Sequence, residues 1–240
     1  MPLALTYPGV YVEEIPSPVH TIATVPTAVA AFAGRAIRGQ VNLPVRIHSP
    51  GDFDRSFGGL WAQSELGQAV QQYFANGGGD AFVVRVIDAA LNTAFSANPS
   101  RIDIPTNGGG TLQIAANSPG TWIRNLAAVV DLNTRKIGTP PATVPGEFNL
   151  TLTLTETDPL TGANKTTVES YRNLTFDSSQ SEYIDTVLAA ESQFVLVANP
   201  PLPAVNALAV GDVPVVGAKP YTYATNPGGG APSDPMNVFR

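Results

Sequence analysis

The sequence contains no cysteine among its 240 residues. This absence excludes disulfide bonds, thiolate metal sites and cysteine nucleophiles together, and it leaves the redox compartment open. Charged residues are also scarce, at 13% of the chain, and acidic residues outnumber basic ones, which gives a net charge of −6. We therefore expect no nucleic-acid partner and no attraction to an anionic membrane. Such an uncharged surface indicates either many neutral polar side chains or cover by other subunits.

Long apolar runs are missing as well. Proline or polar residues interrupt every apolar stretch before it reaches the length of a membrane span. The N-terminus lacks a basic segment followed by an apolar one, so the sequence predicts no signal peptide. We expect no membrane insertion, and we expect the protein to stay in the cytoplasm until it is released by other means.

Patterns that carry catalysis or ligand binding are equally sparse. The two histidines, His20 and His48, have no recognisable nucleophile or carboxylate arrangement beside them. Asp52 and Asp54 could form a metal pair, but an acidic helix N-terminus explains them with fewer assumptions. The glycine run at residues 77–79 follows a predicted helix and precedes no Gly-Lys-Ser/Thr, which argues against a phosphate loop. The sequence thus predicts a protein that is not an enzyme, with no catalytic residue, cofactor or metal site.

The first part of the chain alternates strands and helices. Apolar runs predict buried strands at residues 21–36 and 81–87, and a second, short strand is predicted at residues 44–48. Between them, Ser49-Pro50-Gly51-Asp52 has the form of a helix start, with serine as the N-cap and proline at the first helical position. A longer helix is predicted at residues 63–76, where apolar residues recur at helical spacing and glycines follow. Strand, helix and strand in this order indicate an α/β layer.

The second part of the chain changes to short alternating segments. Turn clusters divide it into strands, which we expect at residues 111–115 and 126–132. Residues 148–155 alternate leucine with threonine, which is typical of a strand with one buried face. A loop at residues 158–162 then returns the chain into a partner strand at 166–171, so the sequence predicts a hairpin.

Two further elements are expected before the chain becomes rich in proline and glycine. Ser179 and Glu182 have the spacing of a capping box, which predicts a short helix at residues 183–190. Residues 194–198 have the composition of a buried strand that returns to the α/β part. Residues 227–240 are predicted to be an exposed, flexible tail.

A proline-bounded strand stands at the N-terminus. Prolines keep the segment extended, and valine, isoleucine and tyrosine favour a strand. Proline also confines such a strand to a sheet edge, either in its own domain or beside a strand of another chain. Both interpretations stay open from the residues. The candidate intersubunit arm consists of Tyr7, Pro8, Gly9, Val10, Tyr11, Val12, Glu13, Glu14 and Ile15.

These elements together predict a mixed α+β fold with four regions. Residues 1–20 form the extended arm, and residues 21–90 with 191–226 form an α/β core. Residues 91–190 form a mainly β domain inserted into that core, and residues 227–240 form the tail. We expect the inserted domain to be removable as a unit, because the two ends of an inserted domain lie close together.

Several motifs, in order and spacing, resemble the N-terminal half of contractile tail sheath proteins. They are residues 7–14, 27–32 with Gly34-Arg35, 53–57 with Gly58-Gly59, Tyr73-Phe74 with Asn76-Gly77-Gly78, and 83–86. A weaker match continues through 118–122, Val168-Glu169 and Asn173-Leu174, so that the resemblance covers residues 7–198. It implies a structural subunit of the contractile sheath of a phage tail or a phage tail-like injection particle.

The resemblance also implies partners and a location. These are other sheath subunits, an inner tube protein and a baseplate, with assembly in the bacterial cytoplasm before the subunit joins a tail. Sheath proteins have a C-terminal domain that completes the α/β core and contacts the tube, and this sequence has no counterpart of it. The chain is accordingly interpreted either as a fragment or as a natural short relative.

Two alternatives to a polymerising sheath subunit remain. One is a short sheath-derived end or adaptor protein that does not polymerise. The other is a binding module in which loops of the β domain contact a receptor or a sugar. Trp122, Tyr171 and Tyr183 could stack on such a ligand, although aromatic side chains in β domains more often fill the core.

Overall fold

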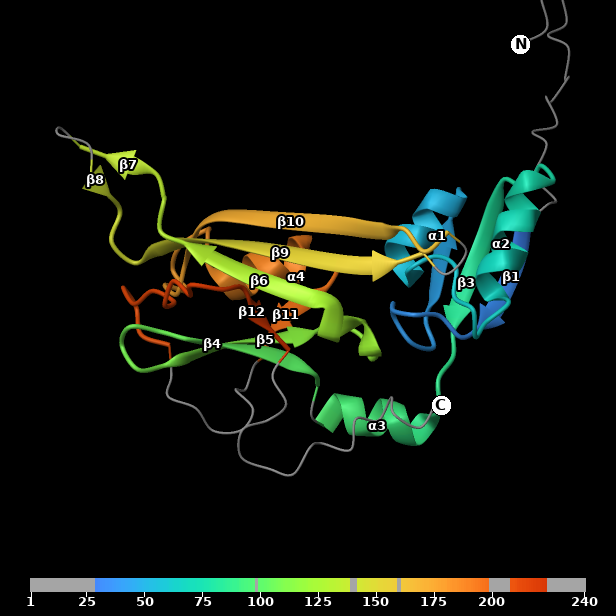
Figure 1. The fold of residues 1–240 in the computed structure, drawn as a ribbon, viewed down its shortest axis with the longest axis horizontal. Coiled ribbons are helices and arrows are strands. Elements are labelled where there is room, and N and C mark those ends of the chain that lie inside the picture. The colour runs from blue at the N-terminus through green and yellow to red at the C-terminus, as the bar shows by residue number, and fades with distance from the viewer. Residues whose placement is uncertain (1–28, 98, 139–141, 159–160, 199–207, 224–240) are drawn as a thin grey trace, which may run out of the picture.

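The computed structural model describes residues 29–97, 99–138, 142–158, 161–198 and 208–223. These residues form a mixed α+β fold with two separate hydrophobic clusters, one in an α/β unit and one in a β unit. We use "α/β unit" for residues 29–88 and "β unit" for the described residues from 89 to 223. Figure 1 shows the α/β unit at one end of the molecule, beside the long strands of the β unit.

The α/β unit is a three-stranded sheet with two helices packed on one face. The strands are β1 (Val29–Gly34), β2 (Pro44–Ile47) and β3 (Asp80–Arg85), in the order β1-β3-β2. Strand β1 runs parallel to β3, and β2 runs antiparallel to it. The helices α1 (Pro50–Phe57) and α2 (Leu66–Ala75) separate β2 from β3 in the sequence. The predicted α/β layer is therefore confirmed for this part of the chain.

Local sequence signals set the ends of both helices. Ser49 is the N-cap of α1, and its hydroxyl accepts a hydrogen bond from the amide of Asp52 at 3.2 Å. Helix α2 begins three residues later than predicted and is followed by Gly77, whose φ of 91° is the left-handed conformation that glycine adopts without strain. The buried side chains of this unit are Ala36, Ile47, Phe53, Phe57, Leu66, Val70, Ala81 and Val83.

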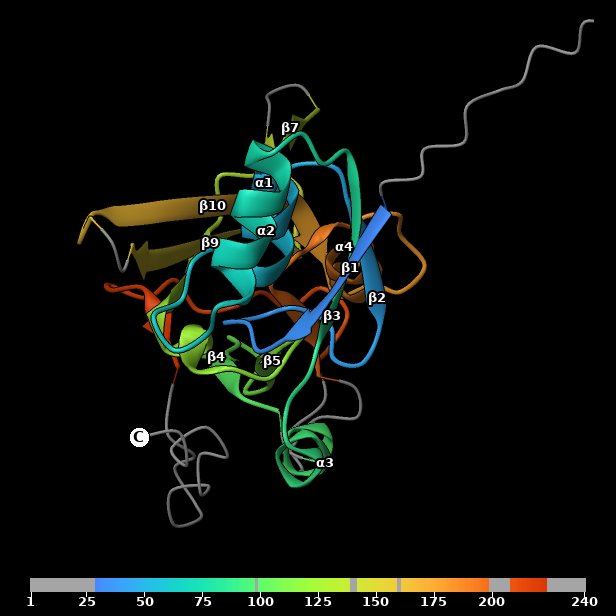
Figure 2. The same ribbon diagram turned by 90° about the vertical axis from the view of Figure 1, so that its right-hand side faces the viewer.

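The other face of this sheet is not buried, which corrects the prediction of fully buried strands. Exposed and half-buried residues alternate along β1, and β1 is an edge strand of its sheet. Phe82 and Val29 are 37% and 48% exposed on the face opposite the helices. Figure 2 shows α1 and α2 together on one side of the sheet. The first eight residues of the predicted strand 21–36 lie outside the described residues.

The β unit is built from two antiparallel sheets that share one hydrophobic cluster. The first sheet has the order β10-β9-β6-β12, and the second has the order β11-β5-β4. Their strands are β4 (Arg101–Pro105), β5 (Thr111–Ala116), β6 (Leu126–Asp131), β9 (Glu147–Thr157), β10 (Asn164–Thr175), β11 (Val195–Val197) and β12 (Tyr221–Thr222). A small hairpin of β7 (Lys136–Ile137) and β8 (Ala142–Thr143) extends from the far end in Figure 1.

The predicted hairpin is the longest feature of the β unit. Strands β9 and β10 pair from Glu147 with Thr175 to Thr157 with Asn164, with a register shift near Tyr171. Every second residue of the Leu-Thr segment points into the core, so that Leu150, Leu152 and Leu154 are fully buried. The alternating pattern therefore predicted the buried face of β9 correctly.

Two local predictions in this region were wrong, and one short element was missed. Residues 89–97 form helix α3 (Ala89–Ala97), although the helical signal fades there, and the side chain of Asp88 accepts from the amide of Ala90 at 2.8 Å. Helix α4 (Ile184–Glu191) exists close to where it was expected, but Ser179 and Glu182 do not cap it. Ser179 donates instead to Asp177, and Glu182 accepts from Ser181. A short 3-10 helix, η1 (Thr121–Asn125), was not predicted.

Strand β11 lies in a different sheet from the one expected. It pairs antiparallel with β5, and β12 pairs with β6, so both strands extend sheets of the β unit. Phe194, expected to enter the α/β core, is buried in the hydrophobic cluster of the β unit. Within the described residues, the strands of the α/β unit come from one continuous segment.

We accordingly predict that residues 89–223 fold on their own when expressed without the α/β unit. The reason is that both sheets and their shared core are formed within this segment. Circular dichroism is expected to show a strand-rich spectrum and a cooperative thermal transition. A segment that stays unfolded would contradict the division into units. By contrast, deleting only residues 91–190 from the chain is not expected to leave a fully folded protein, because β11 and β12 would lose their partner strands β5 and β6.

Candidate functional site

The candidate arm, Tyr7 to Ile15, lies outside the described residues, so its place stays a prediction. The described chain starts at β1, which is the edge strand closest in sequence to the arm. Two features of the described residues are candidate functional sites. They are the outer edge of the β1-β3-β2 sheet and the junction between the two units.

Within the described residues, no strand pairs with the outer edge of β1. The amide of Val86 donates to the carbonyl of Gly34 at 2.9 Å, so the peptide groups of Gly34 and of every second residue before it point toward β3. Those of Ala31 and Ala33 therefore point away from the sheet. A groove of about 480 Å³ is lined by the end of β1, including Phe32, and by the start of α2, including Leu66. An edge of this kind is a template for an additional strand.

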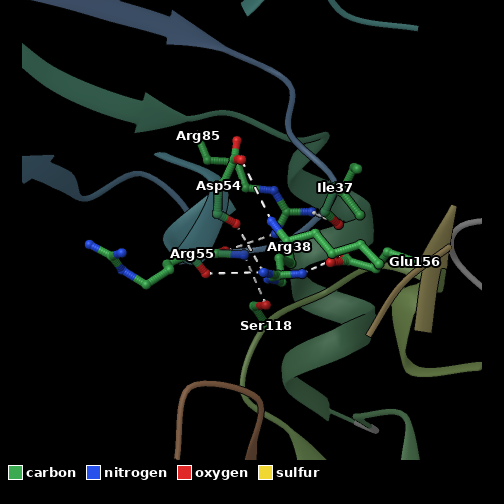
Figure 3. Close-up of polar contacts among 9 residues, drawn as sticks. Ile37, Arg38, Asp54, Arg55, Arg85, Ser118 and Glu156 are labelled. Atoms are coloured by element: carbon green, nitrogen blue, oxygen red, sulfur yellow. Dashed lines mark hydrogen bonds and ion pairs between the residues drawn. The ribbon is translucent and has the colours of Figure 1, made fainter. Parts of the chain in front are cut away.

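The junction between the units is centred on Arg85, the last residue of β3. Its side chain is one of the most buried in the protein, at 1% exposure. The guanidinium donates to the carbonyls of Ala36 (3.0 Å), Ile37 (3.3 Å) and Gly39 (2.8 Å) in the loop after β1. It also donates to the carbonyl of Pro119 in the β unit, at 2.6 Å. One side chain thus holds backbone segments of both units (Figure 3).

Burial lowers the pKa of Arg85 to about 10. The cause is desolvation, which disfavours the charged form of a group taken out of water. The guanidinium still carries its charge at neutral pH, because this value lies well above 7. The four carbonyl dipoles take the place of the water that the charge has lost.

A second arginine, Arg38, spans the same junction and is only 4% exposed. It forms an ion pair with Glu156 near the end of β9, and it donates to the carbonyls of Asp54 (3.0 Å) and Arg55 (3.1 Å) at the end of α1. Its guanidinium also lies over the ring of Phe194, 5.3 Å from the ring centre. Arg38 therefore connects α1 with two parts of the β unit, and Figure 3 shows its polar contacts with Asp54, Arg55 and Glu156.

The conformation of the loop after β1, which contains Arg38 and accepts hydrogen bonds from Arg85, depends on Gly39. Gly39 has a φ of 105°, and a Cβ at this position would lie 2.6 Å from the carbonyl oxygen of Ser56. Its amide donates to the hydroxyl of Ser118 at 3.1 Å, while its carbonyl accepts from Arg85. Any larger residue would push the loop away from both partners.

Three other residues that were considered as candidate site residues, Asp52, Asp54 and His48, form hydrogen bonds or ion pairs within the protein. Asp52 accepts from the amide of His48 at 2.9 Å, which is the main cause of the lowered pKa of its carboxyl group. Asp54 lies 3.6 Å from the ammonium group of Lys165. His48 and Arg46 both contact the carboxylate of Asp80, and the hydrogen bond from Arg46 is the first cause of the lowered pKa of Asp80. His20 lies outside the described residues.

The aromatic residues considered for ligand stacking belong to the core. Trp122 and Tyr171 are buried in the cluster of the β unit, and Tyr183 packs against it. The preference of such residues for the core, noted from the sequence, is confirmed for these three side chains.

Sequence reasoning missed both junction arginines. Arg85 stood out only as a charge in an apolar strand, and that irregularity was its signal. A charged residue is seldom fully buried without partners, so an arginine in a buried strand indicates acceptors close by. Arg38 had no comparable signal, because it lies in a loop, where a charged residue is not unusual.

No protein-family model and no curated protein matches the chain. It is similar to a sheath tail protein from Listeria innocua, with a TM-score of 0.41 and 14% identity over 85% of this chain and 36% of that one. It is also similar to a sheath tail protein from Desulfitobacterium hafniense, with a TM-score of 0.40 and 12% identity over 87% of this chain and 38% of that one. The chain thus spans little more than a third of the length of either structure.

One more observation concerns membranes. In the part of the chain that the structure describes, none of the helices combines the length and the apolar character that crossing a bilayer requires.

Proposed function

We propose that this protein is a structural subunit of the contractile sheath of a phage tail or a phage tail-like injection particle. The sequence motifs at residues 7–14, 27–35, 53–59 and 73–86 support the proposal. The structural observation that carries it is the half-covered sheet of the α/β unit. In the part of the chain that the structure describes, the parallel pair β1 and β3 has helices on one face only, whereas parallel strands are normally buried on both faces.

The proposed mechanism needs no chemistry within the subunit. The arm, residues 7–15, adds a strand to the sheet of a neighbouring subunit and keeps the two tethered. The subunits then rotate and slide against each other while the lattice shortens, and conformational energy stored at assembly is released. An inner tube protein and a baseplate are the further partners in this proposal, and assembly takes place in the bacterial cytoplasm.

The junction between the units suits such a role. Arg38 and Arg85 hold the β unit to the α/β unit through hydrogen bonds and an ion pair that are almost completely shielded from water. A subunit that passes on a mechanical displacement requires its parts to move together. A non-polymerising adaptor or a binding module remains the alternative function, with loops of the β unit as its contact surface.

Electron microscopy of the complete gene product tests the proposal. We expect purified protein to form helical tubes, or to join the tubes formed by a related sheath protein. Protein that remains as single particles at high concentration, and that a related sheath excludes, would favour the adaptor or the binding module.

A further inference from the structure

A concave site at the end of the β unit away from the α/β unit carries an excess of negative charge. It has a volume of about 180 Å³ and lies between the segment before β9, the segment after β10 and the region around Val210. Three carboxylates line it, from Glu147, Asp177 and Glu182, together with the guanidinium of Arg135. We call this site the acidic pocket.

Glu147 is the buried carboxylate of the acidic pocket, with 7% exposure. Its Oε1 accepts from Nε of Arg135 at 2.8 Å and from Nη2 at 2.5 Å. Its Oε2 is buried and has no hydrogen-bond partner among the described residues. A buried carboxylate oxygen without a donor is uncommon in folded proteins and calls for an explanation such as a missing ligand. Arg135 therefore donates to only one of the two oxygens of the Glu147 carboxylate.

The other two carboxylates are ionised at neutral pH. Asp177 accepts from the hydroxyl and the amide of Ser179, at 2.7 and 2.9 Å, and these bonds hold its pKa below the ordinary value. The hydroxyl of Ser181 lowers the pKa of Glu182 in the same way. The acidic pocket thus holds three acidic side chains and one basic side chain, and a concave surface concentrates the resulting field.

The walls of the acidic pocket are suited to an alkyl chain. Val144 and Val210 line it beside the carboxylates. A side chain with an apolar stem and a cationic head buries its stem along such walls and keeps its head at the charges. A planar guanidinium, with its five donors, can bond to more than one carboxylate at the same time.

We propose that the acidic pocket binds an arginine side chain of a partner polypeptide. The guanidinium of this arginine would lie between Asp177 and Glu182, on the side of the pocket where Glu147 is. The site is distinct from the arm and from the junction, and it does not depend on the sheath proposal. In this proposal, the far end of the β unit contacts a basic surface of another protein.

A blocked arginine, Nα-acetyl-L-arginine methylamide, is the probe that tests this proposal. Titration into the full chain at low salt is expected to shift the amide resonances of Thr175, Gln180 and Gly211, which line the pocket. Blocked lysine is expected to bind at least threefold more weakly, because an ammonium group cannot bridge two carboxylates. Raising the salt concentration is expected to weaken binding.

Two substitutions remove charge without removing the local hydrogen bonds. Asp177→Asn and Glu182→Gln keep an oxygen for Ser179 and Ser181, so the loop is expected to stay folded. The double variant is expected to bind blocked arginine about tenfold more weakly. The matched control, Asp185→Asn with Glu191→Gln on α4, removes the same charge outside the pocket and is expected to leave binding within a factor of two.

Three results would overturn the proposal. They are equal binding by the double variant and its control, equal binding of blocked lysine, and shifts of the same amides by magnesium or calcium chloride but not by blocked arginine. The last result would identify the acidic pocket as a site for metal ions.

Discussion

Replacing Arg85 by alanine is expected to lower the free energy of unfolding by about 3–5 kcal/mol. Four backbone carbonyls lose their donor together, and three of them belong to the loop after β1. The sum of four charge-assisted hydrogen bonds would be larger, but the charge is also desolvated in the folded protein, as its lowered pKa indicates. Urea denaturation of the wild type and the variant measures the difference.

Two further variants separate hydrogen bonding from packing. Arg85→Met fills most of the same space without any donor, and we expect it to lose about 2 kcal/mol or more. Arg46→Ala is the control on the same sheet, since Arg46 is exposed and its ion pair with Asp80 is solvated. Its replacement is expected to leave the denaturation midpoint almost unchanged, because a solvent-exposed ion pair contributes little to stability. If Arg85→Met were as stable as the wild type, the carbonyl contacts would not be what holds the junction.

Deleting residues 1–18 is expected to abolish tube formation by the full-length gene product and to leave the melting temperature nearly unchanged. The deleted segment contains the arm, Tyr7 to Ile15, which we propose pairs with a neighbouring subunit. Each hydrogen bond that the arm adds contributes only about 1 kcal/mol net, but a lattice repeats the contact at every subunit. The tether also keeps neighbours at a high effective concentration.

Sedimentation and negative-stain images of the wild type and the deletion variant measure both effects. A variant with Val10 and Val12 replaced by glutamate serves as a matched test, because it keeps the length of the arm and removes its apolar contacts. Normal tubes from the deletion variant would show that the arm is dispensable. A large loss of thermal stability would show that the segment is a strand of its own domain.

Local features of the fold were predictable from the sequence. The N-cap of α1 at Ser49 and the left-handed Gly77 after α2 depend on residues within one turn of the chain. The buried face of β9 followed from strict alternation of leucine and threonine. In each case the interactions that determine the local structure are between residues close in sequence, so a short stretch of sequence is enough to predict it.

The tertiary structure decided the features that depend on distant partners. Composition could not show that β11 pairs with β5, about 80 positions earlier in the chain, because any buried strand of similar apolar character has the same pattern. It could not show that β1 lies at an edge, since an edge is defined by the other strands present. The junction between the units depends most on distant partners. Arg85 donates to backbone carbonyls of residues that lie 34 to 49 positions away in the sequence. Every residue has a backbone carbonyl, so the sequence cannot show which of them accept these hydrogen bonds.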